Sequence, residues 1–192
     1  MRGHPMKRAE VEHVVKAAGT IANDRKVLVI GSNAIYGSVQ LNDCSFYKSH
    51  EVDILFFADN EKKAQEVDGA IGEKSNFHVT FSYYAHGVSA NTATLPRGWE
   101  KRLRILYSEN MGHIKGYCIS AEDLAASKLV AGRDKDFTFV IGMLANKITT
   151  PEKIEELIHK LPRKKDIALD NLNVCRQRIQ SEDKTEDMGT GF

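Results

Sequence analysis

The segment from Lys26 to Ser32 constrains the fold more than any other part of the chain. The run Lys26-Val-Leu-Val-Ile30 is short and β-branched, which is typical of a buried strand. Gly31-Ser32 follows it directly as a turn of small residues, and residues 33–38 after the turn are able to begin a helix. A buried strand that passes through a tight turn into a helix predicts a fold that mixes α and β structure.

Hydrophobic periodicity predicts the other elements and an α/β (α+β) class, a mixed sheet flanked by helices. Strands are expected at 51–57, 77–85, 102–107 and 114–119. Helices are expected at 6–22, 61–71, 120–129, 134–146 and 151–160, and after Pro162, where Ala168, Leu172, Cys175 and Ile179 form a docking stripe. Ser120 and Thr150 are the expected N-caps. We therefore expect an α/β core at 1–119, a helical C-terminal part at 120–180 and a disordered polar tail at 181–192.

Charge and hydropathy exclude several classes of protein. The 192 residues carry 27 basic and 26 acidic side chains, so no overall field favours nucleic acid or membrane surfaces. No apolar segment follows the charged N-terminus as in a secretory signal, and Phe137–Ala145 is about half the ~20 residues that a membrane span needs. Three scattered cysteines predict reduced thiols. We expect a cytoplasmic protein without a membrane contact.

The Gly31-Ser32 turn is a candidate phosphate-binding element. Glycine lets the backbone approach a ligand closely, serine offers a hydroxyl, and the N-terminus of the following helix favours negative charge. The turn has neither the Gly-Lys-Ser/Thr of a Walker A loop nor the three glycines of a dinucleotide fingerprint. The alternative is a plain connection between a strand and a helix, because such turns are very common.

Two carboxylates begin the strand expected at 51–57. The period of two places Glu51 and Asp53 on one face of this strand and Val52 and Ile54 on the other. Neighbouring carboxylates repel each other unless a cation lies between them, and oxygen ligands of this kind suit magnesium. The alternative is an exposed strand end with two solvated charges.

Gly31-Ser32 followed by Glu51-x-Asp53 resembles the signature of the nucleotidyltransferase fold of the DNA polymerase β superfamily. The resemblance continues in Ser120-Ala-Glu-Asp-Leu-Ala-Ala-Ser-Lys-Leu-Val-Ala-Gly-Arg-Asp-Lys-Asp136-Phe, which is similar to the helical element of the AbiEii-like branch. That branch includes toxin components of toxin–antitoxin and abortive-infection systems. Tyr83-Tyr-Ala-His-Gly-Val88 and Leu95-Pro-Arg-Gly-Trp-Glu-Lys-Arg-Leu103 are similar to uncharacterised bacterial members.

The resemblance implies a metal-dependent nucleotidyltransferase. By it, Gly31 and Ser32 bind the triphosphate, Glu51 and Asp53 bind Mg²⁺ or Mn²⁺, Lys128 and Arg133 contact the nucleotide, and Asp136 is a second acidic catalytic position. The implied acceptor is a hydroxyl of an RNA, such as a tRNA end, or of a protein, and an antitoxin is the implied partner. Metals in such sites activate the attacking hydroxyl and stabilise the departing pyrophosphate.

Two features depart from the pattern of this superfamily. The loop between Ser32 and Glu51 is longer than in minimal members, and residues 77–85 show no third carboxylate, for which Glu109 is only a remote candidate. A catalytically inactive module that binds a nucleotide or nucleic acid therefore remains an alternative. So does a structural protein whose last helix pairs with a partner.

The basic residues of the chain also have ordinary interpretations. Lys128, Arg133 and Asp136 are compatible with charge pairing on a helix surface, and Asp134 with a simple N-cap. The stretch 97–104 carries four basic residues around Trp99, which suits either a grip on nucleic acid or a packed indole under solvated charges. A second basic run at 160–165 is typical of a solvated face. The histidines His78, His86 and His113 show no ligand spacing, and no function is assigned to them.

Overall fold

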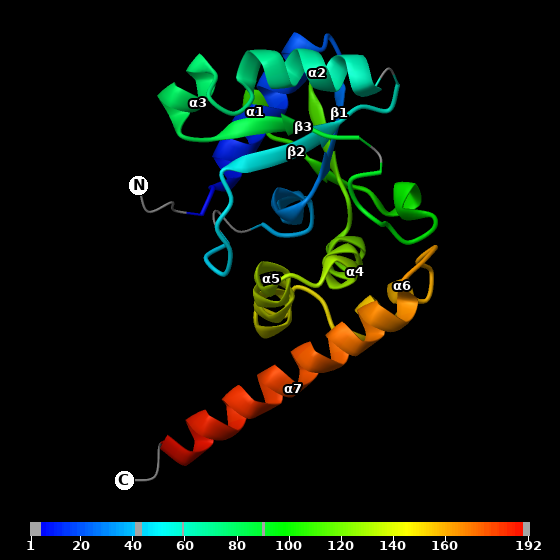
Figure 1. The fold of residues 1–192 in the computed structure, drawn as a ribbon. Coiled ribbons are helices and arrows are strands. Elements are labelled where there is room, and N and C mark those ends of the chain that lie inside the picture. Colours follow the sequence, from blue (N-terminus) through cyan, green and yellow to red (C-terminus); the bar gives the residue numbers. More distant parts are fainter. Residues whose placement is uncertain (1–4, 41–43, 59, 90, 190–192) are drawn as a thin grey trace.

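The computed structural model describes residues 5–40, 44–58, 60–89 and 91–189 (Figure 1). The strands are Lys26–Ile30 (β1), Glu51–Leu55 (β2), Tyr84–Gly87 (β3), Arg104–Leu106 (β4) and Lys115–Cys118 (β5). The α-helices are Arg8–Ile21 (α1), Asn60–Ile71 (α2), Asn76–Phe81 (α3), Ala121–Ala131 (α4), Asp134–Ala145 (α5), Pro151–Ile158 (α6) and Lys165–Gly189 (α7). Short 3₁₀ helices are Ser32–Gly37 (η1), Trp99–Arg102 (η2) and Glu109–Met111 (η3). The expected α/β class with a helical C-terminal part is confirmed.

The five strands form one mixed sheet in the order β3-β2-β1-β5-β4. Strand β1 lies at its centre, antiparallel to β2 and parallel to β5, and β2 is parallel to β3. Residues 27–30 of β1 are all buried, as expected for a strand covered on both faces. Helix α2 lies on one side of the sheet in Figure 1, and α4 to α7 lie on the other.

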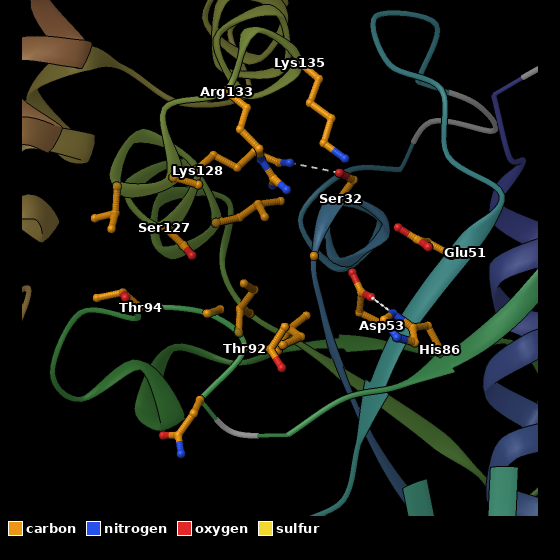
Figure 2. Close-up of a pocket in the computed structure, with 18 of the residues that line it drawn as sticks. Ser32, Glu51, Asp53, His86, Thr92, Thr94, Ser127, Lys128, Arg133 and Lys135 are labelled. Carbon is orange, nitrogen blue, oxygen red and sulfur yellow. Dashed lines mark hydrogen bonds and ion pairs between the residues drawn. The ribbon is translucent and has the colours of Figure 1, made fainter. Parts of the chain in front are cut away.

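Helices α4 and α5 are separate elements that meet at a sharp turn. The side chain of Ser120 caps α4 by accepting a hydrogen bond from the Asp123 amide, as its sequence predicts. Gly132 ends α4 in the left-handed conformation, with φ +63°, which glycine adopts without strain. Arg133 is the N-cap residue of α5, so the interpretation of Asp134 as the cap is wrong. The turn directs residues of both helices toward the Gly31-Ser32 turn (Figure 2).

The prediction of a strand at 77–85 is mostly wrong. Residues 76–81 form helix α3, which begins at Ser75, whose hydroxyl accepts a hydrogen bond from the His78 amide. Phe77 and Phe81 are four residues apart, about one turn of a helix, and the centroids of both rings lie within 5.1 Å of that of His13. The strand itself is short and begins at Tyr84.

The C-terminal helix confirms one prediction and contradicts another. Ala168, Leu172 and Cys175 of the predicted stripe are fully buried, while Ile179 is half-buried. Helix α7 continues to Gly189, although a disordered tail was expected from Ser181, and residues 190–192 lie outside the described part. In Figure 1 this helix extends well away from the sheet. The division of the chain at residue 119 stays a prediction.

Two further expectations concern membranes and thiols. Within the described residues, none of the helices has both the length and the apolar character needed to cross a lipid bilayer. Cys44, Cys118 and Cys175 are buried, and within the described residues they form no disulfide, as expected from their scattered positions. Burial raises the pKa of the Cys118 thiol to about 12, which keeps this group protonated at neutral pH.

Candidate functional site

The Gly31-Ser32 turn leaves the sheet directly beside Asp53. Ile30, the last residue of β1, pairs with Asp53 on β2, so the next residue of the chain passes over the Asp53 carboxylate. Gly31 has φ +68°, and a Cβ atom at this position would collide with that carboxylate. Both the backbone conformation and the available space therefore require glycine here. The helix that follows, η1, is a 3₁₀ helix of six residues, so any dipole effect is small.

Glu51 and Asp53 lie on one face of β2, as the alternation of the strand predicts. Both side chains are half-buried, and they alternate along the strand with Val52 and Ile54, which are fully buried. Burial raises the pKa of Asp53 above its ordinary value, and the charge of Glu51 raises it further. A cation bound between the two carboxylates would remove this repulsion, so the pair favours cation binding.

Strand β3 adds two side chains that the sequence interpretation left without a role. His86 is the register partner of Asp53, and its Nδ1 lies 3.1 Å from Asp53 Oδ1. Tyr84 is the register partner of Glu51 and donates a hydrogen bond of 3.1 Å from Oη to Glu51 Oε2. Burial and the Glu51 carboxylate raise the pKa of Tyr84 to about 12. His86 therefore stands beside Asp53 on the neighbouring strand, one residue beyond the segment 77–85 in which a third carboxylate was sought.

The turn between α4 and α5 supplies a group of cations around one buried acid. Lys128 Nζ lies 3.2 Å from Asp136 Oδ1, and Arg133 Nε lies 2.6 Å from Asp136 Oδ2. Lys128 Nζ also donates a hydrogen bond of 2.9 Å to Ser32 Oγ, across 96 positions of sequence. Lys128 and Asp136 are 9% and 1% exposed, so the surface-helix alternative does not hold for this pair.

The basic side chains near Asp136, which are Lys128, Arg133 and Lys135, outnumber this one carboxylate. Burial alone would raise the pKa of Asp136, but the Arg133 hydrogen bond and the Lys128 charge outweigh it and the pKa is lowered. Burial lowers the pKa of Lys128; attraction to Asp136 opposes this shift, and repulsion from Arg133 and Lys135 adds to it. An ionised Asp136 thus holds two cations but does not neutralise all the charge near it. An anion that binds here would relieve the repulsion.

A cavity of about 460 Å³ joins these two groups of side chains. Figure 2 shows Lys128, Arg133 and Lys135 on one side, with Glu51 and Asp53 across from them and Ser32 between. Five basic side chains line this cavity: Lys128, Arg133, Lys135, Arg163 and Lys164. Its lining carboxylates are Glu51 and Asp53. One cavity therefore presents a cationic wall from the helices and an acidic wall from the sheet.

Comparison with known proteins assigns a family. A family model described as nucleotidyltransferase of unknown function (DUF6036) matches residues 9–184, which is most of the chain. The protein belongs to this nucleotidyltransferase family. Neither the search of curated proteins nor the search of solved structures found a match. The family assignment covers the sheet, the cavity and the helical part together.

The cavity brings together all of the residues that the nucleotidyltransferase resemblance singled out, except that Asp136 lies behind it. Gly31, Ser32, Glu51, Asp53 and Lys128 line the cavity, as does Arg133, whose side chain is largely exposed. Asp136 is buried, does not line the cavity, and accepts hydrogen bonds from Lys128 and Arg133, which do line it. Sequence reasoning missed His86, Tyr84 and Lys135. The alternation of a strand at 84–87 was the available signal for His86 and Tyr84, since it places both on one face.

The donor set of the acidic wall fits a divalent metal ion. Among the residues that the structure describes, no group of three or more His, Cys, Asp or Glu side chains is arranged as a metal site. Glu51 and Asp53 supply two hard oxygen donors, and substrate phosphates and water complete such a site for magnesium, which seldom binds in all-protein cages. Carboxylates suit magnesium and manganese equally.

Two residues of the basic stretch at 97–104, Trp99 and Arg102, have structural contacts. Arg102 donates hydrogen bonds to both carboxylate oxygens of Asp123, which is fully buried at the start of α4. Trp99 is half-buried and packs against the core, in keeping with the packed-indole interpretation. Glu109, the remote candidate for a third acid, lies in η3 and is not among the residues that line the cavity.

Proposed function

We propose that the protein transfers a nucleoside monophosphate from a nucleoside triphosphate to a hydroxyl group. One observation carries this proposal: a carboxylate pair and a cluster of cations face each other across the Gly31-Ser32 turn in a single cavity. Transfer of this kind needs positive charge for the triphosphate and acidic ligands beside the reacting phosphorus. Membership of a nucleotidyltransferase family supports the same assignment.

Each wall has its own task in this mechanism. Gly31 allows the α-phosphate to approach the backbone, and Ser32 and Lys128 donate hydrogen bonds to phosphate oxygens. Arg133 binds the outer phosphates from its exposed position. Asp53, whose carboxylate lies against the Gly31-Ser32 turn, accepts the proton of the attacking hydroxyl. Asp136 is held by two cations with a lowered pKa, so it is a poor base and keeps Lys128 in position.

Glu51 and Asp53 would hold Mg²⁺ or Mn²⁺. A bound ion of this kind supplies Lewis-acid polarisation of the phosphoryl oxygens. Tyr84 orients Glu51 through its hydrogen bond, and His86 orients Asp53 in the same way. Such partners fix the position of a ligating group before the metal binds.

The AbiEii-like resemblance extends the proposal to the acceptor and the biological role. It favours an RNA, including a tRNA end, or a protein hydroxyl as the acceptor, and the toxin of a cytoplasmic toxin–antitoxin pair as the role. An antitoxin protein would then be the physiological partner. The sequence elements that support this extension are Ser120 to Lys128, at the start of α4, and Arg133 to Asp136, at the start of α5.

The test is transfer of label from each α-labelled nucleoside triphosphate to total cellular RNA and protein, with magnesium or manganese. We expect label with the wild-type protein and none with Asp53→Ala. Glu66→Gln, an exposed carboxylate on α2, is the matched control and should retain full transfer. Absence of label from wild-type protein under all these conditions would refute the transferase.

A second function, a nucleotide-binding module without transfer activity, is favoured by one specific observation. The side chain opposite Asp53 on the neighbouring strand is that of His86, so the acidic wall has two carboxylates among the described residues. Wild-type protein that binds a triphosphate by calorimetry yet transfers no label would support this module.

A further inference from the structure

A group of exposed apolar side chains lies on the sheet, away from the residues that line the cavity. Phe57, Ile105 and Tyr107 are 51%, 56% and 43% exposed. Half-buried Tyr117 joins them, because it is the register partner of Ile105 and its ring centroid lies 5.7 Å from that of Phe57. Isolated exposed apolar residues are ordinary on a protein surface, whereas a contiguous group of them is typical of an interaction site. We name these four side chains the β4 patch.

Two lysines lie among the rings of the β4 patch. Lys26 on β1 and Lys115 on β5 are register partners, so they are neighbours on one face of the sheet. Lys115 Nζ lies 5.7 Å from the centroid of the Tyr107 ring. Both lysines are exposed, and in the described part of the chain neither forms an ion pair. Asp24 attracts Lys26, but its carboxylate accepts a hydrogen bond of 2.7 Å from Lys63. The patch therefore combines apolar surface with positive charge.

The β4 patch includes an edge of the sheet. Strand β4 stands last in the order β3-β2-β1-β5-β4, and among the described strands it pairs with β5 alone. In an antiparallel pair, alternate residues of the edge strand direct their N–H and C=O groups away from the partner. Edge strands are usually protected by charged side chains, yet on the face of the patch β4 presents Ile105. This edge is open to a further strand.

An extended polypeptide fits these features better than a nucleic acid or a second copy of the chain. Only a polypeptide main chain pairs with the outward N–H and C=O groups of an edge strand. A nucleic-acid strand favours cations that follow its backbone, whereas Lys26 and Lys115 lie side by side. A second copy on a twofold axis would bring the same patch against itself, and its lysines would repel those of the first.

We infer that the β4 patch docks an extended segment of a partner protein that is rich in aspartate and glutamate and carries large apolar residues. The segment would pair with β4 as a sixth strand of the sheet. An apolar side chain would pack on Ile105 and Tyr117, and a carboxylate would reach Lys115 beside the Tyr107 ring.

This inference does not rest on the proposed function. Phe57 lies four residues beyond Asp53 in the chain, about 13 Å at the rise of a strand. The side chains of the patch are also absent from the lining of the cavity. A docked segment therefore leaves the cavity free, and its binding needs neither a nucleotide nor a metal ion.

The first test selects ligands from a phage library of random twelve-residue peptides on the full chain. We expect the enriched peptides to be acidic and to carry large apolar residues. The peptide with the strongest enrichment is then synthesised with a fluorescent label, and its affinity is measured by anisotropy. Enrichment of basic peptides alone, or none above that on an unrelated protein, would overturn the inference.

The second test measures the selected peptide on variants of the patch. Ile105→Lys should raise the Kd by more than about tenfold, the level of an interface hot spot. The matched control is Val79→Lys, which replaces a 77% exposed apolar side chain on α3 and should bind as wild type does. Lys115→Glu should weaken binding about tenfold and reduce its dependence on salt, whereas Lys62→Glu, on an exposed position of α2, should have no effect. Equal affinity for all four variants would overturn the inference.

Amide NMR of the wild-type chain locates the peptide without any substitution, so it decides the question even if a variant fails to fold. Shift changes at residues 104–107 and 115–117 support docking on the patch. Changes confined to the cavity residues 31–32 and 51–53, or to α3, would overturn it.

Two measurements address the other occupants. Sedimentation that shows a dimer of wild-type protein but a monomer of Ile105→Lys would assign the patch to a second copy. A single-stranded RNA that displaces the peptide would assign it to nucleic acid, and either result overturns the inference. Protein that transfers label but binds no acidic peptide would overturn the docking site alone. Protein that binds the peptide but transfers no label would refute only the proposed function.

Discussion

The two walls of the cavity between the sheet and the helices carry opposite charges and are built from different structural elements. The acidic wall is built on paired strands, where Glu51 and Asp53 repel each other and the pKa of Asp53 is raised. The cationic wall is built on the turn between two helices, where buried Asp136 has a lowered pKa and holds Lys128 and Arg133. One wall has unbalanced negative charge and the other unbalanced positive charge. Each is therefore prepared for a different part of a metal–triphosphate ligand.

A third ion pair, Arg102–Asp123, shows what a purely structural network looks like in the same protein. Asp123 accepts hydrogen bonds from Arg102 and from Ser120, and Arg102 also donates to backbone carbonyls at positions 96 and 97. Asp123 is fully buried and does not line this cavity. The contrast teaches that buried charge alone does not mark a ligand site; the cavity and the unbalanced charge do.

The largest expected effect breaks the acidic wall. Asp53→Asn should lower the transfer rate on the order of 10³-fold, because the lost carboxylate weakens a charge stabilisation worth several kcal/mol and each 1.36 kcal/mol is tenfold. Triphosphate binding without a divalent ion should stay within about twofold of wild type, since the cations that bind phosphate are intact. Label transfer and calorimetry measure the two quantities. A parallel loss of both would show that the walls do not act separately.

The next effect concerns the structural network. Asp123→Asn should lower the free energy of unfolding by about 2 kcal/mol, because it removes the charge from the buried acceptor of the Arg102 hydrogen bonds, while the partly exposed Arg102 stays in contact with water. Urea denaturation measures this change. The control is Glu156→Gln, which breaks the exposed pair with Lys160 and should leave the free energy of unfolding nearly unchanged. A stability unchanged by Asp123→Asn would contradict the structural assignment.

Breaking the cationic wall should affect triphosphate binding. Lys128→Met keeps most of the side-chain volume but removes the charge, and hydrogen bonds to charged groups contribute about 1.5–3 kcal/mol, so affinity should fall roughly 10- to 100-fold. Calorimetry without a divalent ion measures it, with the exposed Lys62→Met as the control. Undiminished affinity would remove Lys128 from the phosphate site.

A smaller effect is expected at His86. His86→Ala should weaken divalent-ion binding by about tenfold, because a partner that orients a ligating carboxylate contributes at this level. Titration with Mn²⁺ followed by electron paramagnetic resonance measures the affinity, and exposed His113→Ala serves as the comparison. If His86→Ala binds Mn²⁺ as wild type does, the Asp53 contact has no orienting role.

The smallest effect is the pH dependence of stability at Asp53. A folded-state pKa above the unfolded value means that the ionised group destabilises the fold once the pH exceeds the raised pKa. Asp53→Asn should therefore have a higher Tm than wild type at neutral pH, without a divalent ion. The difference should shrink as the pH falls through the raised pKa toward the ordinary value for aspartate. A Tm difference that does not depend on pH would exclude this cause.

Local sequence predicted the parts of the site that depend on neighbouring residues. The β-branched run before Gly31 predicted a buried strand and a turn, and alternation placed Glu51 and Asp53 on one face. The N-cap signals at Ser120 and Thr150 were confirmed for the same reason, because capping involves residues three positions apart. The prediction of a strand at 77–81 was wrong. The spacing of four residues between Phe77 and Phe81, and the contacts of both rings with His13, favour a helix.

The sequence by itself determined the glycine turn, the acidic face of β2 and the helical character of the C-terminal third, because each depends on spacings of a few residues. Only the tertiary structure decided that Lys128 reaches Ser32 and that His86 stands opposite Asp53. It also decided that residues 45–50, in the loop after η1, line a cavity beside Glu51. These contacts join residues far apart in the chain. Strand order, register and the turn at Gly132 create them, and no local pattern encodes how those elements pack.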